Sequence, residues 1–255
     1  MTTSVREAPA VIFLPGIVMP AVLRYERLLA ALGDDVRPVL KELEVYRGSS
    51  VPPPGYSLEA ELEGIGRAAD DAGLERFHLF GHSGGGACVL AFTASQPKRV
   101  LTLAVDEPAI DFSPEDLRQI EEVFLPMLDL PPEQQMEAFM REQLRPGVDP
   151  PPPREGPPPP WMSDRPAGVA AMLRAFADSD VPIERLRAFD RPAYYSYGTL
   201  SNPEWERRAE RLSMLLPNLT VERYEGRSHL DTSHMSEPER VAVALRRLWG
   251  TGSQP

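Results

Sequence analysis

Residues 77–86 read Phe77-His78-Leu79-Phe80-Gly81-His82-Ser83-Gly84-Gly85-Gly86 and carry the strongest structural signal in the chain. They contain the pentapeptide G-x-S-x-G, centred on Ser83. The apolar run before it is typical of a buried strand, and the apolar residues that follow predict a helix. A serine at such a junction lies on a strained turn that lifts its hydroxyl clear of the sheet. Glycines flank it because a Cβ at either position would collide with the neighbouring strand or helix turn.

Ser83 has the surroundings that a nucleophilic serine needs. A helix starting at Gly84 directs free backbone N–H groups and the positive end of its dipole at the reacting oxygen. The segment resembles the nucleophile elbow of the α/β-hydrolase superfamily, in which the chain order is serine, acid and histidine. The resemblance implies an α/β fold: a mostly parallel sheet flanked by helices, with an inserted helical cap.

The distribution of apolar runs also predicts a parallel sheet. Strand-like runs alternate with helical segments at the spacing of crossover connections. We expect Ser57 to cap a helix, with Glu61 near the capping-box position, and an apolar stripe on the last helix to pack on the core. The expected strands are 10–14, 36–40, 77–80, 100–105, 193–197 and 219–224, and the expected helices of this pattern are 25–32, 58–72, 84–95, 204–216 and 237–249.

The region from residue 109 to residue 188 has a different pattern. Residues 146–160 are rich in proline. Because proline has no backbone N–H, this segment cannot continue a helix or donate the hydrogen bonds of a strand. We assign residues 1–108 and 189–255 to an α/β-hydrolase core and residues 109–188 to an insertion. Its place between two strands resembles the cap, or lid, of α/β-hydrolases. The helices expected in the insertion are 115–128, 133–144 and 167–177.

The composition limits the classes of partner and the location. A length of 255 residues suits one α/β domain with an insertion, and 42% hydrophobic residues suffice for a core. A net charge of −11 argues against nucleic acid and anionic membranes as partners, since both select basic patches. The single cysteine, Cys88, excludes an internal disulfide. Residues 1–9 lack the apolar stretch of a signal peptide, and no run approaches ~18 apolar residues, so we expect a cytoplasmic protein.

A serine hydroxyl needs a base to accept its proton, and the chain has four histidines. His78 lies on a predicted buried strand, and His82 lies on the elbow, where the turn directs its side chain elsewhere. In α/β-hydrolases the base occupies the loop between the last strand and a final helix that begins near a proline. The resemblance therefore implies that His229 is the base. His234 is the alternative, or a neighbour that lines the pocket.

Two backbone N–H groups are expected to stabilise the oxyanion. The first belongs to Gly84, directly after the nucleophile. The second belongs to the loop after the first strand, where family members usually carry His-Gly and this chain has Pro15-Gly16. By position Ile17 supplies this donor, with Val18 as the alternative. A backbone donor does not depend on its side chain, so the change from histidine to proline is tolerable.

The acid departs from the usual family position. After the strand at 193–197, Ser201 stands where an aspartate is expected. Some family members, haloalkane dehalogenases among them, carry the acid at the end of the preceding strand, where Glu107 aligns best here. Both strand ends converge at the carboxyl edge of the sheet, so the Glu107 carboxylate should lie within about 2.6–3.2 Å of a ring nitrogen of the base. Asp106 and Asp231 are the alternatives.

The sequence favours a cofactor-independent serine hydrolase that acts on an ester, lactone or related acyl substrate through an acyl-enzyme. No phosphate loop, H-E-x-x-H pattern or Cys/His cluster indicates a cofactor or a metal. Dehalogenase chemistry is not expected, because it requires a carboxylate nucleophile. The alternatives are a C–C bond hydrolase or cyclase of secondary metabolism and, in another class, a non-catalytic α/β-hydrolase-fold binding protein.

The expected partner is an apolar small-molecule substrate, and a homodimer is one assembly that the sequence permits. Large apolar side chains in the insertion suit such a substrate, although packing between helices explains most of them equally well. These side chains are Phe124, Met127, Leu128, Met136, Phe139, Met140, Trp161 and Met172.

Overall fold

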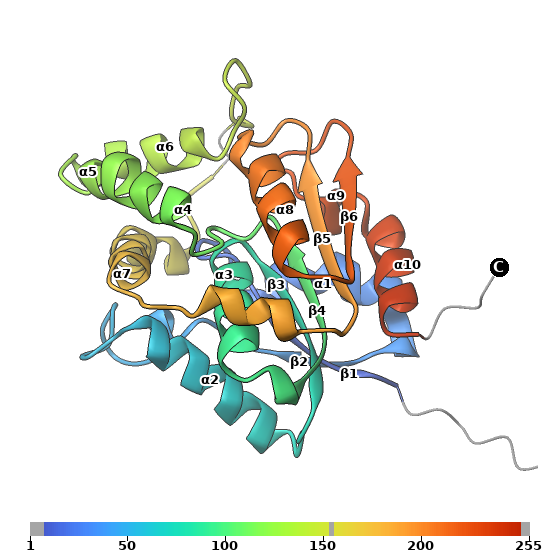
Figure 1. Ribbon diagram of the computed structural model, residues 1–255. Helices are drawn as coiled ribbons and strands as arrows, with labels where there is room; N and C mark the ends of the chain where they lie inside the picture. Colours follow the sequence, from blue (N-terminus) through green and yellow to red (C-terminus); the bar gives the residue numbers. More distant parts are fainter. Residues whose placement is uncertain (1–7, 153–155, 251–255) are drawn as a thin grey trace, which may run out of the picture.

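Six parallel strands form the centre of the molecule (Figure 1). The computed structural model describes residues 8–152 and 156–250. The strands pair in the order β2-β1-β3-β4-β5-β6. The predicted parallel sheet is correct, although β3 and β4 extend further toward their carboxyl ends than expected. The strands are β1 (Ala10–Leu14), β2 (Arg37–Leu40), β3 (Phe77–His82), β4 (Val100–Asp106), β5 (Ala193–Gly198) and β6 (Leu219–Tyr224).

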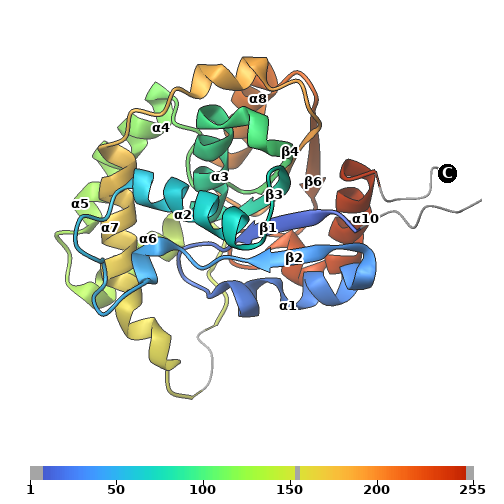
Figure 2. The ribbon, with the colours of Figure 1, turned by 90° about the horizontal axis from the view of Figure 1, so that it is seen from below.

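Helices cover both faces of the sheet because successive strand residues point to opposite sides. In β1, Ile12 and Leu14 belong to the core cluster that includes residues of α2 and α3. Val11 and Phe13 belong to the cluster that includes residues of α1 and α10. Figure 2 shows these two layers on either side of the strands. The helices are α1 (Ala21–Leu32), α2 (Leu58–Asp71), α3 (Ser83–Ser95), α8 (Glu204–Leu215) and α10 (Pro238–Leu248).

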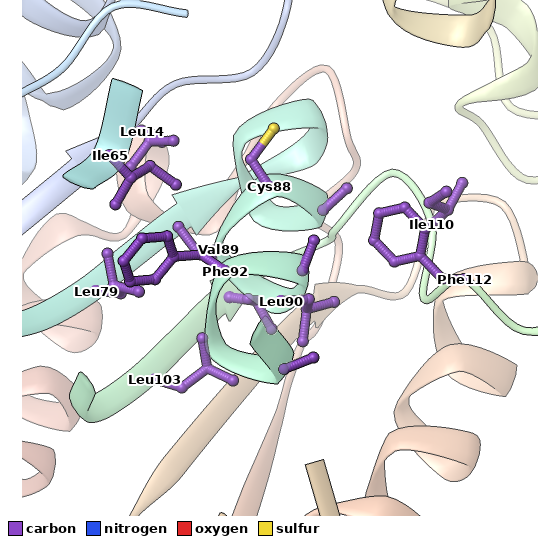
Figure 3. Packing of buried hydrophobic residues seen from close by; sticks show 14 of the residues in the cluster. Leu14, Ile65, Leu79, Cys88, Val89, Leu90, Phe92, Leu103, Ile110 and Phe112 are labelled. Atoms are coloured by element: carbon purple, nitrogen blue, oxygen red, sulfur yellow. The ribbon is translucent and has the colours of Figure 1, made fainter. Parts of the chain in front are cut away.

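Helix α3 is buried on every side, which fixes its first turn relative to the sheet. All residues from Ser83 to Ala94 are buried. Figure 3 shows the apolar side chains of α3 among residues of α2, the strands and the segment after β4. Burying one large apolar side chain contributes roughly 1.5–3 kcal/mol, so this cluster anchors the elbow. Cys88 lies in it as expected, and burial raises the pKa of its thiol.

The chain between β4 and β5 forms the helices drawn in green and yellow in Figure 1. The single helix expected at 115–128 is instead divided, because a π-helical turn at Ile120–Phe124 separates two α-helical pieces. Pro126 explains the division: it has no N–H to bond the carbonyl of Glu122, and its ring crowds that carbonyl. The α-helices of this segment are α4 (Pro114–Gln119), α5 (Leu125–Met127), α6 (Pro132–Glu142) and α7 (Arg165–Ala177).

The capping prediction for α2 was half correct. Ser57 accepts a hydrogen bond from the N–H of Ala60 and caps the helix. Glu61 does not complete a capping box, because it lies one residue beyond the required position and turns inward. Its buried carboxylate accepts hydrogen bonds from the N–H groups of Glu44 and Val45. Glu61 therefore ties α2 to the loop after β2.

The C-terminal segment matches its prediction apart from one addition. The apolar stripe of α10 packs on the core, with Val241 and Leu245 fully buried. A short helix that was not predicted, α9 (Ser233–Ser236), precedes it, and four residues are too few to show a periodic pattern. Predictions that concern residues 1–7 and 153–155 lie outside the described residues. Among the residues that are described, no helix is long and apolar enough to cross a membrane.

Candidate active site

Ser83 stands at the junction of β3 and α3 with a left-handed backbone, at a φ of 51°. The two glycines of the pentapeptide allow this turn, as predicted. A Cβ on Gly81 would lie 2.5 Å from the carbonyl oxygen of Gly85, and a Cβ on Gly85 would lie 2.4 Å from that of Pro15. Such contacts with backbone cannot be relieved by side-chain rotation. The elbow therefore requires glycine at both positions.

The structure brings Ser83, His229 and Glu107 together at the carboxyl edge of the sheet. His229 Nε2 lies 3.0 Å from Ser83 Oγ, and His229 Nδ1 lies 2.8 Å from Glu107 Oε2. The second distance falls in the range expected from the sequence. All three residues are buried. A carboxylate accepts only, so Nδ1 carries the proton in the neutral ring and Nε2 is free to accept the serine hydroxyl proton.

Glu107 reaches His229 because the chain turns sharply at the end of β4. Its φ of 47° is left-handed, and its own N–H donates to the carbonyl of Ser196 on β5. The carboxylate oxygen that does not face His229 accepts hydrogen bonds from the N–H of Gly198 (2.7 Å) and the hydroxyl of Ser201 (2.5 Å). These two hydrogen bonds fix the orientation of the carboxylate.

Trp205 was not foreseen as part of the site. Its ring stacks on the imidazole of His229, with centroids 4.4 Å apart and an interplanar angle of 18°. Its Nε1 donates to the carbonyl of Pro108, directly after Glu107, at 3.0 Å. Trp205 thus fixes the ring plane of His229. The only feature of the sequence that could have indicated this role is the position of Trp205 near the start of α8, shortly after the strand where we expected the acid.

The two expected oxyanion donors border the same space as the serine. Ile17, Ser83 and Gly84 all line one pocket, whereas Val18 does not. The nitrogen of Ile17 lies 3.8 Å from the place that a Cβ on Gly84 would take. The N–H of Gly84 is in the first turn of α3 and so has no partner within the helix. Tyr46 fixes the Ile17 peptide by donating its hydroxyl to the Ile17 carbonyl at 2.7 Å.

The alternative acids and the alternative base lie elsewhere. Asp231 is about half exposed and pairs with Arg227. Asp106 Oδ2 lies 2.5 Å from His234 Nδ1, and not against His229. Residues His234 and Asp106 therefore form a second carboxylate–histidine pair, separate from the one at Ser83. His82, expected to point elsewhere, lies between the two pairs, with its ring centroid 4.8 Å from that of His229.

His82, Asp106 and His234 are also the one group among the described residues whose ligand atoms are near enough to hold a metal, within 4.8 Å of one another. Both carboxylate oxygens of Asp106 already accept hydrogen bonds, from His234 on one side and from serines on the other. Burial, with the nearby Arg24 guanidinium adding to it, lowers the pKa of both histidines. The hydrogen bonds within the fold therefore already occupy the carboxylate of this group.

The pocket at Ser83 is lined by both apolar and polar residues. Helices of the insertion supply many of the apolar ones, and the segment from Asn202 to Arg208 supplies some of the polar ones. Buried Arg208 is held there by Asp116 at 2.5 Å. Three of the side chains predicted from the insertion, Phe124, Phe139 and Met172, line this pocket, and Met127, Leu128 and Met136 line a smaller one beside it. Met140 and Trp161 line neither.

Comparison with known proteins agrees with this fold. The chain matches the alpha/beta hydrolase family over residues 11–244, and it belongs to that family. A comparison with curated proteins gave no significant match.

Solved structures of similar fold have low sequence identity to this chain. A hydrolase from Pseudomonas aeruginosa PA01 is 20% identical, with a TM-score of 0.70, over 96% of this chain and 91% of that chain. An esterase from Thermogutta terrifontis is also 20% identical, with a TM-score of 0.70, over 95% and 90%. Carboxylesterase CesB from Bacillus subtilis is 20% identical, with a TM-score of 0.65, over 97% and 86%.

Proposed function

We propose that this protein is a cofactor-independent serine hydrolase that cleaves an ester, lactone or related acyl substrate through an acyl-enzyme. One observation carries the proposal: an unbroken chain of contacts from Ser83 Oγ to His229 Nε2 (3.0 Å) and from His229 Nδ1 to Glu107 Oε2 (2.8 Å). Membership of the alpha/beta hydrolase family and the esterases among proteins of similar fold also support it.

In the first half of the reaction, Ser83 Oγ attacks the substrate carbonyl carbon while its proton passes to His229 Nε2. The carbonyl electron pair moves onto oxygen, where the N–H groups of Ile17 and Gly84 stabilise the developing charge. Glu107 holds the imidazolium through Nδ1 and stays ionised. When the tetrahedral intermediate collapses, His229 Nε2 returns the proton to the leaving alkoxide, and an alcohol departs.

In the second half, water replaces the alcohol. His229 Nε2 takes a proton from the water as its oxygen attacks the acyl carbon, and the same two N–H groups stabilise the second oxyanion. Collapse breaks the bond to Ser83 Oγ, which takes back the proton from Nε2. The carboxylic acid leaves, and the starting state is restored. Apart from the substrate, both half-reactions use only groups of the protein and one water molecule.

We propose that residues 109–188 act as the cap over this site. Side chains of α6 and α7 and of the π-helical turn line the pocket that Ser83 borders, and most of them are aliphatic or aromatic. Such a lining favours a substrate with an apolar acyl or alcohol part. Met172 of α7 packs against the first turn of α3, because its Sδ is 2.7 Å from the place that a Cβ on Gly84 would take.

Ester hydrolysis tests the proposal directly. Purified protein should hydrolyse p-nitrophenyl butyrate or octanoate, and the folded Ser83→Ala variant should not exceed the buffer rate. A panel that includes lactones and vinylogous 1,5-diketones separates acyl transfer from C–C cleavage. A folded wild-type protein that binds apolar probes but hydrolyses no member of the panel would instead indicate a non-catalytic binding protein.

A further inference from the structure

His82 lies directly behind the proposed catalytic residues, on the strand that leads to Ser83. Its side chain is buried (1% exposed), so its polar contacts are made with protein groups. The ring centroid is 4.8 Å from that of His229, with an interplanar angle of 32°, and 4.9 Å from that of His234. The His82 ring therefore separates the proposed base from the second carboxylate–histidine pair.

Asp106 provides a fixed anchor for His82. The Asp106 carboxylate is held by three side chains: His234 Nδ1 at 2.5 Å, Ser196 Oγ at 2.7 Å and Ser233 Oγ at 3.3 Å. His82 Nδ1 lies 3.0 Å from the carbonyl oxygen of the same aspartate. A carbonyl can only accept, so His82 carries its proton on Nδ1 and its ring orientation is fixed from the end of β4.

The opposite edge of the His82 ring faces the oxyanion loop. A Cβ on Gly16 would lie 2.9 Å from His82 Cδ2 and 3.3 Å from His82 Nε2, so the ring and the Gly16 backbone are already close. Gly16 directly precedes Ile17, the proposed oxyanion donor. One ring thus contacts the base on one side and the backbone of the donor segment on the other.

We infer that His82 is a positioning residue for catalysis: anchored to Asp106, its ring sets the place of both the His229 imidazole and the Gly16–Ile17 segment. The inference rests on the proposed hydrolase function. A displacement of about 1 Å in a reacting group can cost about 100-fold in rate, so loss of this support is expected to lower kcat. His82 does not line the pocket at Ser83, so we expect KM to change little.

The same substitution at two neighbouring histidines gives a matched test. In His82→Asn, the amide retains a donor for the Asp106 carbonyl but removes the ring from His229 and Gly16. In His234→Asn, the amide retains a donor for the Asp106 carboxylate, and His82 keeps its own hydrogen bond to the Asp106 carbonyl. We expect kcat to fall about 30- to 100-fold in His82→Asn with KM within about twofold, and at most about threefold in His234→Asn. Equal losses of kcat in both variants would overturn the inference.

Imidazole NMR gives a readout that does not depend on turnover. With four histidines in the chain, each ring can be assigned by single substitutions. The His229 Nδ1–H signal should be sharp and downfield in the wild type and in His234→Asn, and shifted or exchange-broadened in His82→Asn. An unchanged signal in His82→Asn would overturn the positioning role. Failure of the proposed function is a different result: no ester turnover by the wild type, whatever the His229 signal shows.

Discussion

The hydroxyl of Ser201 donates a hydrogen bond to the carboxylate of Glu107 at 2.5 Å. Ser201 lies on the loop after β5, at the position where the resemblance to α/β-hydrolases predicts the acid. The residue that replaces the usual acid therefore supports the proposed one. A small hydroxyl fits this position, whereas a second carboxylate here would repel Glu107.

Replacing Ser201 by Ala should lower kcat about tenfold with little change in KM. The reason is that a hydrogen bond to a charged group contributes about 1.5–3 kcal/mol, and the imidazolium depends on a correctly oriented Glu107. Steady-state kinetics on a p-nitrophenyl ester measure the effect. Ser213→Ala removes a hydroxyl that bonds only within α8 and serves as the control. Equal kinetics in the two variants would contradict a supporting role for Ser201.

Replacing Glu107 by Gln should cut turnover strongly and leave stability nearly unchanged. Glutamine has the same shape but cannot balance the charge of the imidazolium. Adding Ser201→Asp to this variant should recover part of the activity, because a carboxylate on that loop reaches the same region. The comparison uses kcat and urea unfolding for the single and the double variant. If Glu107→Gln kept full activity, another group would have to be the acid.

His229→Ala should lower turnover by about 10³-fold or more, since the ring bonded to Ser83 Oγ would be lost. His234→Ala should have a much smaller effect, because His234 faces Asp106. Both variants are compared with one ester at saturating concentration. A larger loss in His234→Ala than in His229→Ala would reverse the assignment of the base.

The contribution of His78 to the free energy of unfolding should rise with pH between about 4 and 6.5. Burial lowers the pKa of His78 from its ordinary value of 6.5 to about 4. The unfolded chain therefore binds more protons in this window, and the contribution of the neutral ring is complete above 6.5 and is lost as the pH falls toward 4. The lowered pKa values of His82 and His234 act in the same direction.

His78→Asn tests this account, since an asparagine can keep the contact that His78 Nδ1 makes with the Thr102 hydroxyl and does not titrate. Urea unfolding at several pH values should give a shallower dependence in the variant than in the wild type. An unchanged slope would show that His78 titrates in the same way in the folded and unfolded states.

The sequence was most informative where consecutive residues determine the structure. Gly81, Ser83 and Gly85 specify the elbow locally, and apolar runs specify the strands around it. Glu107 required an argument from strand order, because the acid and the base lie far apart in the chain. The roles of Trp205 and His82 depend on how rings from different strands and helices meet, and no spacing in the sequence encodes that.

The insertion was the least predictable part of the fold. Its amphipathic pattern gave the helices, but Pro126 introduced a π-helical turn that periodicity alone does not show. Of the large apolar side chains there, some line the pocket and others do not. For the side chains on the predicted helices, that division follows from how the helices pack on one another, because the amphipathic pattern alone does not distinguish them.

The most direct test of the nucleophile is incubation with a fluorophosphonate followed by intact mass measurement. We expect one adduct per chain in the wild type, because the proposed mechanism has Ser83 activated by His229 and by the backbone donors at the start of α3. The folded Ser83→Ala variant should show none. A folded wild-type protein that stays unlabelled, or a Ser83→Ala variant that labels equally well, would contradict the assignment of Ser83 as the nucleophile.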